Sequence, residues 1–189
     1  ISSGMNVASG MHSRLSSFSE IAEAAKRNNV QLHDLRFSDK QFQTGKGGKR
    51  SGKRLLTVGT DCSVGKKYTA LAIERAMQGN QIDASFKATG QTGILIAESG
   101  IAIDAIVSDF ISGAVEWLSP DNDDNHWDII EGQGSLFHPS FAGVSLGLLH
   151  GSQPDAFVVC HEPTRTNMRG VDTPLPSIRE VIDQTIQNG

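Results

Sequence analysis

The sequence predicts an α/β fold with a parallel sheet covered by helices on both faces. Short apolar runs at 55–58, 127–130 and 155–160 alternate along the chain with longer segments of helical spacing. These runs are mostly continuous instead of alternating with polar residues, which is typical of parallel strands buried on both faces. A length of 189 residues, with 38% hydrophobic and 20% charged residues, is sufficient for one such domain and a smaller appendage.

Residues 1–37 have the pattern of the end of a separate α/β unit. A helix is predicted over 17–28, where apolar residues at helical spacing follow serines that we interpret as its cap. A short strand is predicted over 30–36. The chain opens on Ile1 instead of Met and closes just after a helical pattern, so we interpret it as a fragment that is incomplete at both ends.

A basic, glycine-rich segment over 38–53 follows this unit. Its charged and small residues are Lys40, Lys46, Lys49, Arg50 and Lys53, interleaved with Gly45, Gly47, Gly48 and Gly52. Two interpretations stay open. The segment is either a solvated flexible linker or a mobile basic flap that covers bound phosphates.

The third part, 54–189, carries the alternating strands and helices. Beyond the three strands above, we predict a strand at 82–88 and helices at 68–77, 103–118, 145–150 and 177–186. A second glycine loop is predicted at 90–93. Ligands of parallel sheets bind beyond the carboxyl ends of the strands, so the loops that follow these strands are expected to form one site.

A phosphate-binding loop is predicted between the strand at 55–58 and the helix at 68–77. Its residues are Gly59, Thr60, Asp61, Cys62, Ser63, Val64, Gly65, Lys66 and Lys67. A strand that enters a glycine turn and then a helix directs several backbone N–H groups and the positive end of the helix dipole at one point. Lys66 can reach the outer phosphates with its ammonium group. These features predict a P-loop NTPase-like domain.

The loop departs from the common P-loop pattern at two positions. The usual first glycine is replaced by Thr60, with Gly59 one residue earlier, which resembles the loop of dethiobiotin synthetase. Lys67 stands where a Ser or Thr hydroxyl ordinarily binds magnesium. Hydrolysis of a magnesium-bound triphosphate is therefore less favoured, although Ser63 or Thr69 could replace that hydroxyl.

Polar residues after the other strands are the remaining candidates for the site. Glu131 follows the strand at 127–130 and is flanked by glycines, so it is a candidate catalytic carboxylate or metal ligand. His161 follows the strand at 155–160 and is a candidate general base. Candidate substrate-binding residues are Lys87, Gln91, Thr92, Gln133 and Arg165. No spacing of His and Cys residues indicates a zinc site, and we predict no metal ligand set.

Taken together, six sequence blocks resemble one known family. They are 58–67, 88–93, 107–114, 130–139, 148–155 and 160–163. The family is a group of P-loop proteins, long of unknown function, that includes a D-glutamate N-acetyltransferase. The resemblance covers nearly the whole chain. It implies two-domain proteins, with 1–37 the end of a Rossmann-like N-terminal domain, 38–53 a linker and 54–189 a P-loop domain truncated at its end.

The resemblance also implies an activity. The leading hypothesis is transfer of acetyl from acetyl-CoA to the amine of a small acidic amino acid such as D-glutamate, with the P-loop on the coenzyme phosphates. Glu131 or His161 would be the base, and Lys66 or loop amides would stabilise the oxyanion. Two alternatives stay open: an ATP- and magnesium-dependent ligase or kinase of the dethiobiotin-synthetase type, and a nucleotide-binding regulatory protein.

Composition limits the partners of the protein. A net charge of -4 argues against general nucleic-acid binding. No apolar run approaches the roughly 20 residues that span a bilayer, and the N-terminus lacks a signal pattern, so we predict a cytoplasmic protein without a membrane partner. Cys62 and Cys160 are predicted to be reduced thiols. A homo-oligomer is compatible with the sequence.

Overall fold

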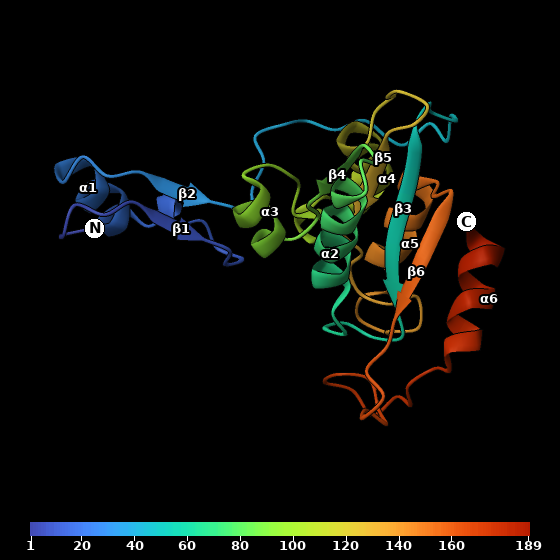
Figure 1. Cartoon of the computed structure of the whole chain (residues 1–189). Coiled ribbons are helices and arrows are strands. Elements are labelled where there is room, and N and C mark those ends of the chain that lie inside the picture. Colours follow the sequence, from blue (N-terminus) through green and yellow to red (C-terminus); the bar gives the residue numbers. More distant parts are fainter.

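The computed structural model describes residues 1–189, which form a small N-terminal unit beside a larger domain (Figure 1). The N-terminal unit contains β1 (Val7–Ser9), α1 (Ser19–Arg27) and β2 (Leu32–Asp34). The larger domain contains β3 (Lys53–Gly59), α2 (Lys66–Gly79), β4 (Ala84–Lys87), α3 (Gln91–Ala97), α4 (Ile111–Leu118), β5 (Trp127–Ile130), α5 (Ala142–Ser152), β6 (Ala156–Cys160) and α6 (Ile178–Asn188).

The larger domain is built on a four-stranded parallel sheet in the order β4-β5-β3-β6. Leu56 of β3 lies opposite Ile130 of β5 on one side and Phe157 of β6 on the other. Since all four strands run in the same direction, their carboxyl ends share one edge of the sheet. The predicted strand at 127–130 is confirmed with the same bounds, and the other predicted strands differ from the observed ones by at most two residues at either end.

Helices cover both faces of the sheet, as predicted. Helix α2 packs against β3, β4 and β5, where Ile129 meets Ala70 and Phe86. On the other face, α4 and α5 pack together, and Ile130 joins a core with Val115 and Leu148. Successive residues of β5 thus enter two different cores because side chains of a strand alternate between its faces.

Two predictions for the chain between β4 and β5 were wrong. The glycine loop expected at 90–93 is instead the start of α3, which begins at Gln91. The single helix expected at 103–118 is broken into 3₁₀ turns at Ile103–Ala105 and Ser108–Phe110, followed by α4. The turns close with 3₁₀ hydrogen bonds, from the N–H of Ile106 to the carbonyl of Ile103 and from the N–H of Phe110 to the carbonyl of Val107. The N–H of Ile103 also ties the start of this stretch to the carbonyl of Thr89 after β4.

The N-terminal unit is a β-α-β arrangement in which β1 and β2 pair in parallel. Strand β1 was not predicted, and α1 begins after Phe18 without the side-chain cap that the serines suggested. The unit contacts the larger domain in two places. The buried side chain of Arg36 pairs with Asp104, and Gly10 lies so close to α3 that a Cβ there would be 2.5 Å from Cγ of Gln91.

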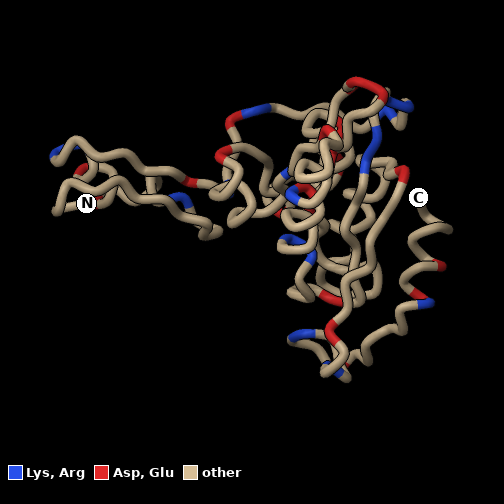
Figure 2. The backbone as a smooth tube through the Cα atoms, in the orientation of Figure 1, with Lys and Arg blue, Asp and Glu red and all other residues tan.

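The basic segment that precedes β3 lies at the edge of the sheet opposite the P-loop. The guanidinium of Arg50 donates to the carbonyls of Ser119 and Gly151, and the Lys46 N–H donates to Glu116. Figure 2 shows basic positions near the acidic loop that precedes β5, where the N–H and hydroxyl of Ser51 donate to Asp121. The interpretation as a flap over bound phosphates is therefore wrong, because polar contacts hold the segment on the far side of the domain.

Candidate functional site

The predicted phosphate-binding loop connects β3 to α2 at the carboxyl edge of the sheet (Figure 1). Gly65 precedes the helix with φ of 99°, a conformation that favours glycine. The backbone N–H groups of residues 63–68 donate to no acceptor in the protein. Such unpaired amides at a helix N-terminus form an anion site together with the helix dipole. The loop therefore has the geometry that phosphate binding requires.

The side chain of Lys66 lies beneath this loop and is only 6% exposed. Its Nζ donates to the carbonyl oxygen of Asp61 at 2.7 Å. Burial lowers the pKa of the Lys66 ammonium to about 8. The amine is therefore still mostly charged at neutral pH.

A cavity of about 520 Å³ opens beside the loop. Among the predicted site residues, it is lined by Cys62, Ser63, Gly65, Lys66, Lys67, Gln91, Thr92, Glu131 and Gln133. The structure thus joins the loop after β3, the start of α3 and the loop after β5, as the shared edge predicted. Tyr68 also lines the cavity and was not predicted as a site residue. The signal in the sequence was its position directly after Lys67. In the structure, Nζ of Lys67 lies 4.6 Å from the centroid of the Tyr68 ring.

Glu131 is the buried carboxylate of this cavity, with 4% exposure. Its Oε2 accepts from the N–H groups of Thr89 at 3.0 Å and Gly90 at 3.1 Å, whereas Oε1 accepts no hydrogen bond from the protein. Burial raises the pKa of the Glu131 carboxyl, and these two hydrogen bonds, the Lys67 charge and the side-chain amide of Gln133 offset the effect only in part. The carboxylate is therefore fixed in position and has one oxygen available to a ligand.

Lys87 and His161 do not line the cavity, although the strands that carry them end at the same edge. The Lys87 side chain points along the sheet face to Asp128, with Nζ 3.2 Å from Oδ1. His161 Nδ1 lies 3.2 Å from the hydroxyl of Thr60. Neither side chain is therefore placed to act on a ligand in the cavity.

Arg165 also lies outside the cavity, on the opposite side of the loop. Its guanidinium donates to Oδ2 of Asp61 at 2.7 Å and to the carbonyls of Cys62 and Ser63. Asp61 is fully buried, and its Oδ2 also accepts from the N–H of Arg169. Burial by itself raises the pKa of the Asp61 carboxyl, but the hydrogen bonds from Arg169, Arg165 and Cys62 outweigh it and keep that pKa below its usual range. Arg165 therefore holds the loop in shape.

The hydroxyls that could replace the missing magnesium ligand make other contacts. Thr69 Oγ1 accepts from the Cys160 thiol, and Ser63 Oγ accepts from Arg169 at 2.6 Å. Lys67 itself lines the cavity and adds a positive charge there. The loop thus presents cationic and N–H groups to a phosphate but no free hydroxyl in the usual metal position.

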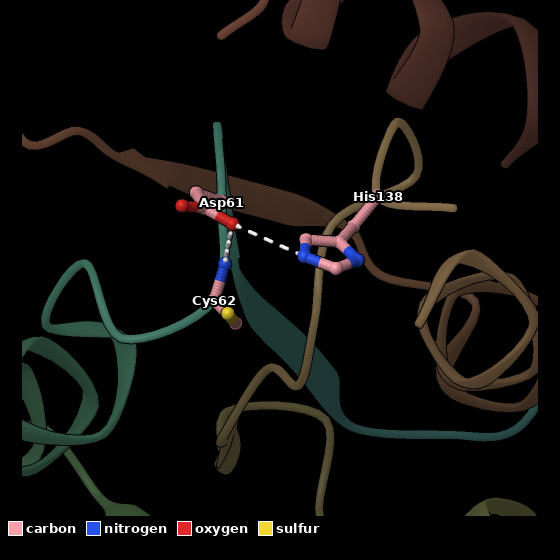
Figure 3. A group of neighbouring side chains, drawn as sticks. All are labelled: Asp61, Cys62 and His138. Atoms are coloured by element: carbon pink, nitrogen blue, oxygen red, sulfur yellow. Dashed lines mark hydrogen bonds and ion pairs between the residues drawn. The ribbon is translucent and has the colours of Figure 1, made fainter. Parts of the chain in front are cut away.

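Asp61, Cys62 and His138 lie close enough together to resemble a metal site (Figure 3). His138 Nδ1 accepts from the N–H of Ser140, so Nε2 carries the proton and donates to the Arg169 carbonyl at 3.0 Å. Burial and the nearby Asp61 charge raise the pKa of the Cys62 thiol, which favours its neutral form. The histidine lone pair and the carboxylate oxygens are therefore already used within the protein, and the group does not fit a metal ion.

The strand, glycine loop, buried lysine and helix N-terminus define a P-loop protein. A family profile described as "Domain of unknown function (DUF1611_C) P-loop domain" matches residues 41–188. A second, described as "Domain of unknown function (DUF1611_N) Rossmann-like domain", matches residues 1–38. The chain belongs to the DUF1611 family, and the resemblance found in its sequence blocks is confirmed.

The chain is similar to two curated proteins named D-glutamate N-acetyltransferase. One, from Pseudoalteromonas sp, is 60% identical over 187 residues, which cover 98% of this chain and 56% of that protein. The other, from Tritonibacter scottomollicae, is 54% identical over 95% of this chain and 54% of that protein. The chain thus spans about half the length of the curated relatives it matches.

A solved structure shares the fold. The crystal structure of a DUF1611 family protein from Anabaena variabilis, at 2.30 Å resolution, superposes with a TM-score of 0.91 at 32% identity. The match covers 99% of this chain and 55% of that one. Separately, none of the helices of the present structure combines the length and apolar character that a bilayer crossing requires.

Proposed function

We propose that the protein is an N-acetyltransferase that moves acetyl from acetyl-CoA to the amino group of D-glutamate. The observation that carries this proposal is the 60% identity, over 98% of the chain, to a protein named for that reaction. The cavity supports it, because a phosphate-binding loop and a buried carboxylate line the same space.

The P-loop fits the phosphates of the coenzyme. The unpaired amides of residues 63–68 and the ammonium of Lys66 suit a phosphate group, and Lys67 adds charge without needing a metal. Acetyl-CoA supplies the acetyl group as a thioester, whose chemistry takes place away from its phosphates. A loop that grips phosphate but lacks the usual magnesium hydroxyl therefore suits this ligand better than a triphosphate.

Glu131 is the residue that we assign as general base. The ammonium of the substrate must lose a proton before its nitrogen attacks the thioester carbonyl. The C–N bond then forms to give a tetrahedral oxyanion, which collapses as the C–S bond breaks and the coenzyme leaves as its thiolate. The raised pKa of Glu131 brings its basicity closer to neutral pH, and Oε1 is free to accept the proton. His161 is the less suitable base because it lies outside the cavity, next to Thr60.

Other groups in the cavity suit the remaining tasks. The Lys66 ammonium and the loop amides are assigned to the phosphates, so the donors for the negative charge that develops on the carbonyl oxygen would come from other lining residues, such as the side-chain amides of Gln91 and Gln133. Gln91, Thr92 and Gln133 offer amide and hydroxyl donors to the carboxylates of the amino acid. These residues lie at the start of α3 and in the loop after β5, so the substrate would be held from two sides.

Calorimetric titration tests the proposal, using acetyl-CoA and ATP, each with and without magnesium. We expect acetyl-CoA to bind without magnesium, and Lys66→Ala to weaken that binding by about 1 to 3 kcal/mol, the range for loss of a charged hydrogen-bond partner. An assay of acetyl transfer to D-glutamate and L-glutamate accompanies the titration. Tight magnesium-dependent ATP binding together with no acetyl-CoA binding would contradict the proposal and favour an ATP-dependent ligase.

A further inference from the structure

Arg169 is an exposed residue whose backbone is held by buried side chains. Its N–H donates to Oδ2 of Asp61 at 2.7 Å, and its carbonyl accepts from Nε2 of His138 at 3.0 Å. Asp61 is 0% exposed and His138 is 1% exposed. Burying polar groups costs free energy unless they are hydrogen-bonded, so this arrangement makes the position of Arg169 part of the buried structure.

The residues on either side of Arg169 add to this restraint. Met168 is buried at 2% exposure, and its N–H donates to the carbonyl of Thr173. Gly170 then turns the chain with a positive φ. The segment therefore folds back on itself at Arg169, and the buried anchors fix where its side chain emerges.

The side chain of Arg169 emerges beside the P-loop, next to the cavity and not among the residues that line it. Its Nη1 donates to Oγ of Ser63 at 2.6 Å, and Ser63 lines the cavity. The remaining guanidinium N–H groups make no hydrogen bond in the protein. Arg165 differs, because it donates to a carboxylate and two carbonyls of the loop and is committed to them. Arg169 is therefore the arginine at this rim that has donors to spare.

The chemistry of a guanidinium suits a phosphate group. Its planar arrangement of donors matches phosphate oxygens in a bidentate way, and it keeps its charge at all relevant pH values. The loop amides next to Ser63 suit one phosphate, and the guanidinium beside Ser63 is in place for another group on the same ligand.

We propose that Arg169 binds a second phosphate of the ligand whose first phosphate lies on the P-loop amides. This inference rests on the proposed function, under which the second group is the ribose 3′-phosphate of acetyl-CoA. His138 is then a positioning residue, since it reaches the ligand only through Arg169, and Asp61 positions Arg169 in addition to holding the loop through Cys62 and Arg165.

The test compares acetyl-CoA with 3′-dephospho-acetyl-CoA on the wild type, Arg169→Gln and Arg169→Lys. We expect Arg169→Gln to weaken acetyl-CoA binding about 10- to 100-fold, as for loss of a charge-assisted hydrogen bond, and to leave 3′-dephospho-acetyl-CoA binding within about twofold. Arg169→Lys should restore part of the loss, because it keeps the charge but not the bidentate geometry. Arg179→Gln is the matched control, since Arg179 is an exposed arginine of α6 that contacts only Asp183.

The outcomes separate this inference from the function on which it rests. If Arg169→Gln weakened both coenzyme forms equally, or neither, Arg169 would not bind the 3′-phosphate, and the acetyltransferase proposal would still stand. If the wild type bound neither form, the proposed function would fail and this assignment with it. A loss limited to acetyl-CoA, absent in Arg179→Gln, would support both.

Discussion

The two sides of the P-loop differ in how their polar groups are used. On the cavity side, the amides of residues 63–68 and Oε1 of Glu131 have no partner in the protein. On the opposite side, Asp61 Oδ1 accepts from the N–H of Cys62, and Oδ2 accepts from the guanidinium of Arg165 and from the backbone N–H of Arg169, both in the segment after β6. One side is thus free to bind a ligand because the other side holds the loop in shape. Substitutions on the two sides should therefore affect different properties.

The largest effect is expected for Glu131→Gln, on the cavity side. If Glu131 is the base, kcat for acetyl transfer should fall about 100- to 10 000-fold, the usual contribution of general base catalysis. Glutamine can still accept from the N–H groups of Thr89 and Gly90, so the fold and the affinity for acetyl-CoA should be retained. Steady-state kinetics together with calorimetry measures both quantities. An unchanged kcat would remove Glu131 from the mechanism.

The next effect concerns stability and lies on the opposite side. Asp61→Ala leaves a buried arginine contact and two N–H groups without their acceptor, so the free energy of unfolding should fall by about 3 to 5 kcal/mol. Urea denaturation measures this change. Asp183→Ala is the control, because it removes an exposed ion pair of α6 and should cost less than about 1 kcal/mol. Similar losses in the two variants would show that the Asp61 network does not stabilise the loop.

The smallest effect is a pH dependence of binding through Lys66. Its ammonium has a pKa of about 8 in the folded protein, so it is charged below that pH and neutral above it. Affinity for acetyl-CoA should therefore decrease as pH rises through about 8, by roughly tenfold at one pH unit above the pKa, because a neutral amine no longer attracts phosphate. Titrations between pH 6.5 and pH 9.5, chosen as roughly 1.5 units on either side of that pKa, test this. The dependence should be absent in Lys66→Ala, and its persistence there would assign it to another group.

The sequence was informative where neighbouring residues decide the structure. The strand at 127–130 and the P-loop could be predicted from local pattern alone, because a short apolar run and a glycine turn before a helix are recognisable in the sequence itself. The broken helix at 103–118 could not be predicted in this way. Its turns at Ile103–Ala105 and Ser108–Phe110 are 3₁₀ turns, and helical spacing of apolar residues does not distinguish these from a continuous α-helix.

The sequence predicted the edge of the sheet at which the site lies, but not the directions in which the individual side chains point. Each candidate followed a strand and was expected at the same edge, yet Lys87 points to Asp128 and His161 lies at Thr60. The face to which a strand residue points depends on register, which a single sequence does not reveal. The anchoring of Arg169 by Asp61 links residues 108 positions apart, so no local pattern marks it.

The contact between the N-terminal unit and α3 has a consequence for recombining domains. Arg36 and Gly10 belong to the unit, whereas Asp104 and Gln91 belong to the larger domain, and Gln91 also lines the cavity. A chimera that joins this unit to a P-loop domain from a distant relative would have to carry all four residues, or the wall of the cavity would lose its support. The two domains are therefore not independent modules at α3, because the N-terminal unit packs against Gln91, a residue of the larger domain that lines the cavity.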